Sequence, residues 1–245
     1  MTARDEILAR IRTANRTANR TGAAGTGQTA AAAGAPDAAA VDAAYQALPR
    51  DYLRAHHDPA EHDIVALFAD RAADYRAVVE RVPAPEVPAA IACALSPRAH
   101  PSPSTSPPTS DISRFVVPRG FPSDWLTEVS ADIELASDEP PLSAAELDAT
   151  AGVITGCAVA IAETGTIILD HGPGQGRRAL TLVPDFHLVV VRADQVAADL
   201  ADAFARLDPS RPHTLISGPS ATSDIELIRV EGVHGPRTLH ILLAG

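Results

Sequence analysis

The 245-residue chain contains no lysine, and all 20 of its basic residues are arginines. A lysine amine is needed for a Schiff base, for the phosphate-binding P-loop and for the Ser-x-x-Lys nucleophile. The composition therefore excludes these three kinds of site.

Cysteine is almost as scarce, because the chain has only Cys93 and Cys157, far apart in the sequence. No CxxC pair is present, so neither a zinc site nor an iron–sulfur cluster can be built from this chain's thiolates alone. We expect both cysteines to be small buried hydrophobic residues. The sequence predicts no metal site and no cofactor bound by this chain.

The chain also lacks an excess of positive charge and a long apolar run. The formal net charge is −11, which argues against a nucleic-acid-binding protein, because phosphate contacts need a basic surface. No run approaches the roughly 18 apolar residues of a membrane helix, so no membrane insertion is expected. Residues 1–6 carry acids where a signal peptide would be basic, which favours a cytoplasmic location.

Two segments of biased composition divide the chain. We expect an N-terminal helix over residues 2–21 and a flexible Ala/Gly linker over 22–40, followed by one domain over 41–245. Within that domain, residues 96–111 are rich in proline and serine and are expected to form an exposed loop.

The domain alternates between helical and strand-like patterns, which indicates an α/β fold with a mostly parallel sheet flanked by helices. The clearest helical pattern runs over 194–207, with Asp194 as its cap. We expect helices at 59–73, 86–95, 122–128, 143–149, 194–207 and 223–228, and strands at 77–82, 115–117, 133–135, 153–161, 166–169, 187–191, 215–216 and 239–243.

The run from Ser217 to Glu226 is the best candidate for ligand contact. An expected strand leads into Gly218, Pro219 and Ser220, and Ser223 with Glu226 forms a capping-box pattern for a short helix. The backbone amides at the start of a helix have no partners within the helix. Where such a helix follows the carboxyl end of a strand, these amides can bind a carboxylate or a phosphate. The same groups can equally serve only to cap the helix.

A glycine-rich segment, residues 171–178, ends in Arg177 and Arg178. Its Gly-x-Gly-x-Gly spacing, interrupted by Pro173, does not match a dinucleotide-binding fingerprint. Arginine side chains can bind an anion through bidentate hydrogen bonds. The alternative is a strand connection with two solvated arginines, which is slightly favoured for Arg178.

Several isolated residues are candidates for chemistry. Glu163 lies at the tip of an apolar segment and can act as a general base, or simply pair with an arginine or accept turn amides. His234, and His187 near Asp185, are candidate bases or metal ligands, although lone histidines are more often structural. The candidate catalytic residues are Glu163 and His234, and the candidate ligand-binding residues are Thr164, Gly165, Arg177, Gly218, Ser220, Thr222 and Asp224.

Five motifs together resemble the LUD domain family, and within it the lactate utilisation proteins. The resemblance covers roughly residues 41–245 and is densest from Thr155 onward. The motifs are Thr155-Gly156, the Ala-Glu-Thr-Gly-Thr run at 162–166, residues 182–187, the Gly-Pro-Ser run at 218–220, and Gly-Val-His-Gly-Pro-x-x-Leu-His at 232–240.

The resemblance implies an α/β fold similar to the sugar-phosphate isomerase and CoA-transferase (NagB/RpiA-like) superfamily. It also implies a component of an L-lactate oxidation system that works with iron–sulfur partner proteins carrying the clusters. On this reading the chain is an accessory or substrate-positioning subunit that binds a small carboxylate or phosphate anion. The alternative is a stand-alone enzyme of acyl transfer or isomerisation that uses Glu163.

Overall fold

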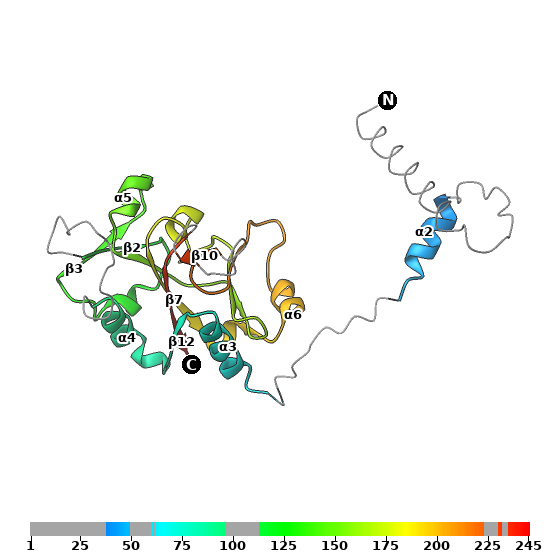
Figure 1. Ribbon diagram of the computed structural model, residues 1–245, viewed down its shortest axis with the longest axis horizontal. Helices are drawn as coiled ribbons and strands as arrows, with labels where there is room; N and C mark the ends of the chain where they lie inside the picture. Colours follow the sequence, from blue (N-terminus) through cyan, green and yellow to red (C-terminus); the bar gives the residue numbers. More distant parts are fainter. Residues whose placement is uncertain (1–37, 50–59, 61, 97–112, 223–229, 232–234) are drawn as a thin grey trace, which may run out of the picture. The chain divides into compact units, whose positions relative to one another are not determined.

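The computed structural model describes residues 38–49, 60, 62–96, 113–222, 230–231 and 235–245 (Figure 1). The chain divides into two compact units, Met1–Tyr52 and Leu53–Gly245. The first contains helix α2 (Ala38–Gln46), whose first residues fall in the expected linker. The expected helix at 2–21 and nearly all of the expected loop at 96–111 lie outside the described residues.

The centre of the second unit is a six-stranded sheet in the order β1-β12-β7-β4-β2-β3, and every neighbouring pair is parallel. This confirms the predicted α/β fold. The inner strand β7 is almost continuously apolar, as expected for a strand buried on both faces. The strands are β1 (Val78–Val82), β2 (Ser113–Val117), β3 (Ile133–Ser137), β4 (Gly152–Thr155), β7 (Phe186–Arg192) and β12 (Thr238–Ala244).

Alternate side chains of the main sheet enter two different apolar cores. In β7, Leu188 and Val190 pack with helix α4 (Val87–Ala94). Val189 and Val191 face the other way and pack with helix α3 (Ile64–Asp74). Helix α5 (Ala144–Asp148) contributes its buried Leu147 to a smaller cluster over β2 and β4.

A second, mixed sheet packs on the α3 side of the main sheet, in the order β8-β5-β6-β9. The chain passes from β4 into β5 through residues 156–158, so one apolar run of the sequence serves both sheets. Its strands are β5 (Val159–Ile161), β6 (Thr166–Leu169), β8 (Val196–Ala197) and β9 (Thr214–Ile216). Strands β5 and β6 form an antiparallel hairpin around residues 162–165.

The single helix predicted over 194–207 is wrong. Val196 and its neighbour instead form β8, because Val196 pairs with Ala160 of β5 and is buried there. Helix α6 (Leu200–Ala205) starts after Asp199, whose carboxylate accepts a hydrogen bond from the Asp202 amide at 3.1 Å. Pairing with an existing sheet has overridden the helical spacing of the apolar residues.

Part of the apolar face expected for that helix is uncovered. Leu200 and Phe204 are about half exposed, with 51% and 45% of their surfaces accessible.

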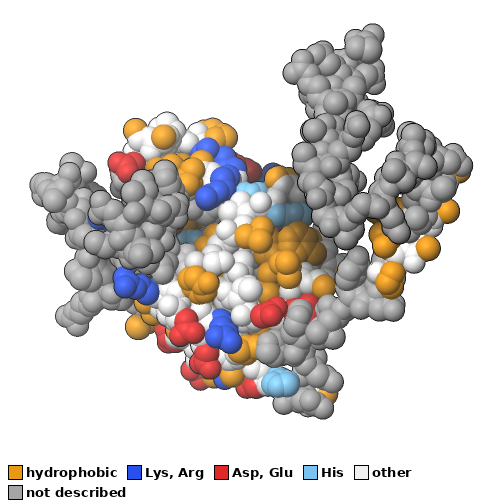
Figure 2. Space-filling model, turned by 45° about the vertical axis from the view of Figure 1, so that its right-hand side comes forward, with side chains coloured by type: hydrophobic (Ala, Val, Ile, Leu, Met, Phe, Trp, Pro, Cys, Tyr) orange, Lys and Arg blue, Asp and Glu red, His pale blue; other side chains and the backbone are white. Residues whose placement is uncertain are grey.

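On one face of the molecule, hydrophobic side chains gather beside histidine and arginine side chains (Figure 2). Among the described residues, no helix is both long and apolar enough to span a membrane.

Helix boundaries follow local capping chemistry. Helix α3 begins at Ile64 rather than at Pro59, because the Asp63 carboxylate accepts the Ala66 amide at 2.9 Å. The predicted capping box of α5 is confirmed, since Ser143 and Glu146 each bond the other's backbone amide.

The two cysteines differ in their environment. Cys157 is buried as predicted, and its thiol donates to Gln195 Oε1 at 3.6 Å. Burial raises the pKa of the Cys157 thiol to about 12, so it stays protonated. Cys93 was predicted to be buried, and that is wrong: it lies on the exposed side of α4, whose inner side is occupied by Ala90, Ile91 and Ala94.

Candidate functional site

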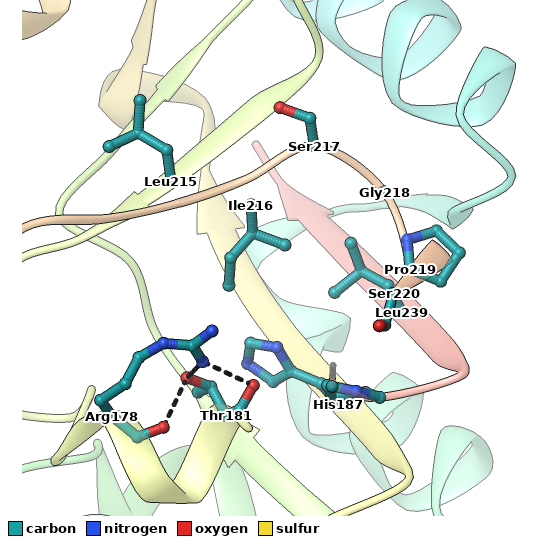
Figure 3. Close-up of a pocket in the computed structure, with 12 residues that line it drawn as sticks. Arg178, Thr181, His187, Leu215, Ile216, Ser217, Gly218, Pro219, Ser220 and Leu239 are labelled. Atoms are coloured by element: carbon teal, nitrogen blue, oxygen red, sulfur yellow. Dashed lines mark hydrogen bonds between the residues drawn. The ribbon is translucent and has the colours of Figure 1, made fainter. Parts of the chain in front are cut away.

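A pocket of about 280 Å³ lies on the α3 side of the main sheet (Figure 3). Its walls come from the 3₁₀ helix Arg178–Thr181, from β7, from β9 with the segment that follows it, and from the residues leading into β12. They are Arg178, Thr181, His187, residues 215–220, 235 and 236, and Leu239.

The pocket lies at the amino ends of the parallel strands. His187 and Leu239 are the second residues of β7 and β12, and they are direct neighbours in the sheet. The run after Leu215 and Ile216 does follow a strand's carboxyl end, as predicted, but that strand is β9 of the second sheet. The site therefore forms between the two sheets rather than at the carboxyl edge of the parallel one.

The segment after β9 is held by close backbone contacts. Gly218 has a φ of +81°, and a Cβ at this position would lie 2.6 Å from the carbonyl oxygen of Tyr75 at the end of α3. The Ser220 amide donates to the Pro236 carbonyl at 2.8 Å. Both Gly218 and Ser220, predicted as ligand-binding residues, line the pocket.

The structure continues from Ser220 into a strand. Strand β10 (Ala221–Thr222) pairs antiparallel with β11 (Val230–Glu231). The helix expected at 223–228 lies outside the described residues, as do the candidate residues Asp224 and His234. Thr222 is the last residue of β10.

Arg178 supplies the positive charge of the pocket. Its Nη1 donates to the Thr181 carbonyl at 3.0 Å and to the Thr181 hydroxyl at 3.1 Å (Figure 3). In the described part of the chain, no carboxylate forms an ion pair with Arg178, and no other charged residue lines the pocket. The guanidinium is therefore placed to receive an anion.

His187 forms part of the pocket floor and is electrically neutral. Its Nε2 lies 2.7 Å from the hydroxyl oxygen of Thr155, the last residue of β4. Burial, and after it the positive charge of Arg178, lower the pKa of His187 to about 3. Figure 3 shows the ring pointing toward Arg178 and Thr181. At neutral pH this side chain can hydrogen-bond a ligand but adds no charge.

The neighbouring Arg177 has a different role. Its Nε and Nη2 bond the two carboxylate oxygens of Asp138 at 2.7 and 2.9 Å, and Nη2 also donates to the Leu142 carbonyl. Burial raises the pKa of Asp138, but hydrogen bonds from Arg177 and Leu142, with the arginine charge, lower it further, so the carboxylate stays ionised. Arg177 thus secures the segment before α5 and does not line the pocket.

The glycine-rich segment is tied to its surroundings. The Asp170 carboxylate accepts from the Gly172 amide at 3.0 Å and from Gln175 at 2.8 Å, and it pairs with Arg211 at 2.8 Å. His171 bonds the Gly176 carbonyl and the Thr214 hydroxyl through its two ring nitrogens. These contacts hold the glycine-rich segment in place after β6.

Glu163, Thr164 and Gly165 form the turn between β5 and β6, and none of them lines the pocket. The Glu163 amide donates to the Ala198 carbonyl at 3.1 Å. Gly165 has a φ of +59°, and a Cβ there would lie 2.5 Å from the Ala72 amide in α3. This turn is therefore pressed against the backbone of α3.

A chain of hydroxyl groups connects this turn to the pocket. The Thr164 and Thr166 hydroxyl oxygens are 2.7 Å apart, and Thr166 is 2.8 Å from the hydroxyl of Ser217. Ser217 opens the segment that carries Gly218 and Ser220. The Ala-Glu-Thr-Gly-Thr motif thus braces the pocket from behind instead of lining it.

Three polar residues of the pocket were not among the predicted ligand-binding residues. Arg178 was considered but ranked below Arg177, Thr181 belonged to no motif, and His187 was considered as a base or metal ligand. The basic pair at 177 and 178 was the sequence signal nearest to the pocket's arginine. Asp185 itself bonds Arg237 at 2.6 Å. Among the described residues, no group of three metal-ligating side chains occurs.

The chain is similar to several known proteins. The LUD domain model matches residues 138–244, which include the whole described pocket. Lactate utilization protein C of Deinococcus radiodurans is 49% identical over 187 residues, covering 75% of this chain and 80% of that protein. The protein YkgG of Escherichia coli is 38% identical over 84 residues, covering 31% of this chain and 36% of YkgG.

A solved structure shows the same fold. The crystal structure of a DUF162 family protein from Deinococcus radiodurans is 41% identical, with a TM-score of 0.58. The match covers 77% of this chain and 99% of that one. With these likenesses, the chain belongs to the LUD domain family, in the group of lactate utilization protein C.

Proposed function

We propose that this chain is a component of an L-lactate oxidation system, in which it acts in the cytoplasm as an accessory or substrate-positioning subunit. The name of the relative that is 49% identical over most of both chains supports a role in lactate utilization. The pocket supports a role in binding, because it brings one arginine and several hydroxyl groups together in a small concave site.

The oxidation itself is assigned to partner proteins. Removing two electrons from lactate requires an acceptor, and such chemistry belongs to a cofactor. Two distant cysteines cannot supply the four thiolates of a cluster, and the Cys157 thiol is buried, bonded and protonated. We therefore propose iron–sulfur partners that carry the redox centre, with this chain presenting the substrate.

The single observation that carries the binding role is the contrast between two adjacent arginines. Arg177 forms a bidentate ion pair with Asp138, whereas Arg178 faces the pocket without a carboxylate partner in the described part of the chain. The alternative of an independent acyl-transfer or isomerising enzyme depended on Glu163. That residue lies in the β5–β6 turn and does not line the pocket, so no observation favours this alternative.

Deleting the gene should abolish or strongly slow growth on L-lactate and leave growth on glucose unchanged. The reason is that the partners would lack the subunit that presents the substrate. Growth curves on each carbon source measure the effect. Normal growth on lactate, in a host without a second lactate dehydrogenase, would refute the proposed role.

A further inference from the structure

We propose that the pocket around Arg178 selects a small monocarboxylate with a short apolar tail, and discriminates against phosphate and dicarboxylates. This inference rests on the proposed role in lactate utilization and names the ligand class of that same site. It is carried by the charge and the lining of the pocket.

The charge of the described lining balances a single negative charge. Arg178 is its one cation, and His187, the other titratable side chain, is neutral because burial keeps its pKa near 3. A carboxylate can bond the Arg178 guanidinium, which lies beside the Thr181 hydroxyl. A phosphate dianion or dicarboxylate would carry a second charge into the pocket without a second cation among the described lining residues, and an unpaired charge removed from water is costly.

Part of the wall opposite Arg178 is apolar. Ile216 and Leu239 contribute side chains that also belong to the core between the two sheets, and Pro219 and Pro236 complete this side. Figure 3 shows Ile216 pointing toward the His187 ring, from the segment that faces Arg178 and Thr181. A methyl or ethyl group can be buried here, whereas a second carboxylate would find no donor among these side chains.

The pocket is small. Pockets for drug-sized ligands measure roughly 300–1,000 Å³, and this one measures about 280 Å³. A small organic acid fits this space, and the discrimination among small anions comes from the charge and the lining. Rigidity adds to the selection, because Gly218 is seated on Tyr75 and Ser217 is bonded to Thr166, so the wall has little room to move.

Calorimetric titration of the full-length protein tests the ligand class. The probes are L-lactate, glycolate without the methyl group, L-malate with a second carboxylate, and inorganic phosphate. We expect L-lactate to bind at least about tenfold more tightly than malate or phosphate, and more tightly than glycolate by a few-fold. Arg178→Gln should lower lactate affinity about 10- to 100-fold, because it removes a charge-assisted hydrogen bond.

Two further variants keep this test decisive. Arg119→Gln is the matched control, since Arg119 is a highly exposed arginine that does not line the pocket, and its affinity should equal that of the wild type. Arg178→Lys retains the charge and should bind better than Arg178→Gln, and thermal melts show that each variant is folded.

Equal or tighter binding of phosphate or malate would overturn the ligand class, as would full lactate affinity in folded Arg178→Gln. Absence of lactate binding at millimolar concentrations would overturn the site while leaving the proposed function to the growth experiment. A normal deletion strain would refute that function even if lactate binding were observed.

Discussion

Gly165→Ala should destabilise the second unit by about 2–4 kcal/mol. The residue has a φ of +59°, which costs an alanine roughly 1 kcal/mol. The larger cost is steric, since the new Cβ would lie 2.5 Å from backbone atoms of Arg71 and Ala72 in α3. Backbone atoms cannot rotate away, so either the turn or the helix has to shift.

Urea unfolding followed by circular dichroism measures this loss. Gly156→Ala is the matched control, because the nearest atom to its new Cβ is the Gly174 carbonyl oxygen at 3.9 Å. That variant should stay within about 0.5–1 kcal/mol of the wild type. Equal stability of the two variants would show that the β5–β6 turn is not pressed against α3.

The buried His187 should make the protein sensitive to acid. Its pKa is about 3 in the folded protein and about 6.5 when exposed. Between these values the unfolded chain binds the proton and the folded one does not, so stability is complete above pH 6.5 and falls as the pH drops toward 3. From pH 7 to pH 4 this one residue should cost about 3 kcal/mol.

The comparison of two proteins at two pH values isolates this contribution. His187→Asn cannot take up the proton, so its unfolding free energy should change about 3 kcal/mol less between pH 7 and pH 4 than that of the wild type. Other titrating groups, including the ionised Asp138, are common to both proteins and cancel. Parallel pH dependence of the two proteins would show that His187 is not buried as described.

The parts of the fold predicted correctly are those governed by local chemistry. The apolar run of β7 and the capping box of Ser143 and Glu146 are visible in a few neighbouring residues. The strand at Val196 cannot be recognised from its neighbouring residues. Its partner Ala160 lies more than thirty residues away in the sequence, and only the folded sheet brings the two together. Helical spacing of apolar residues was therefore a misleading signal there.

The site shows the same division. The Gly-Pro-Ser run was recognised, and Gly218 and Ser220 do line the pocket. The role of Arg177 depends on Asp138, which comes from the loop before α5, and no local pattern predicts that pair. Thr164 and Gly165 were predicted to bind a ligand and Glu163 to be catalytic. None of the three lines the pocket, and their turn contacts α3 and connects to Ser217 through Thr166.

Complementation of the deletion strain most directly tests whether the protein serves lactate utilization through the Arg178 pocket. Wild type and Arg119→Gln should restore growth on L-lactate, whereas Arg178→Gln, present at the same level by immunoblot, should not. Full restoration of growth by Arg178→Gln would contradict this account.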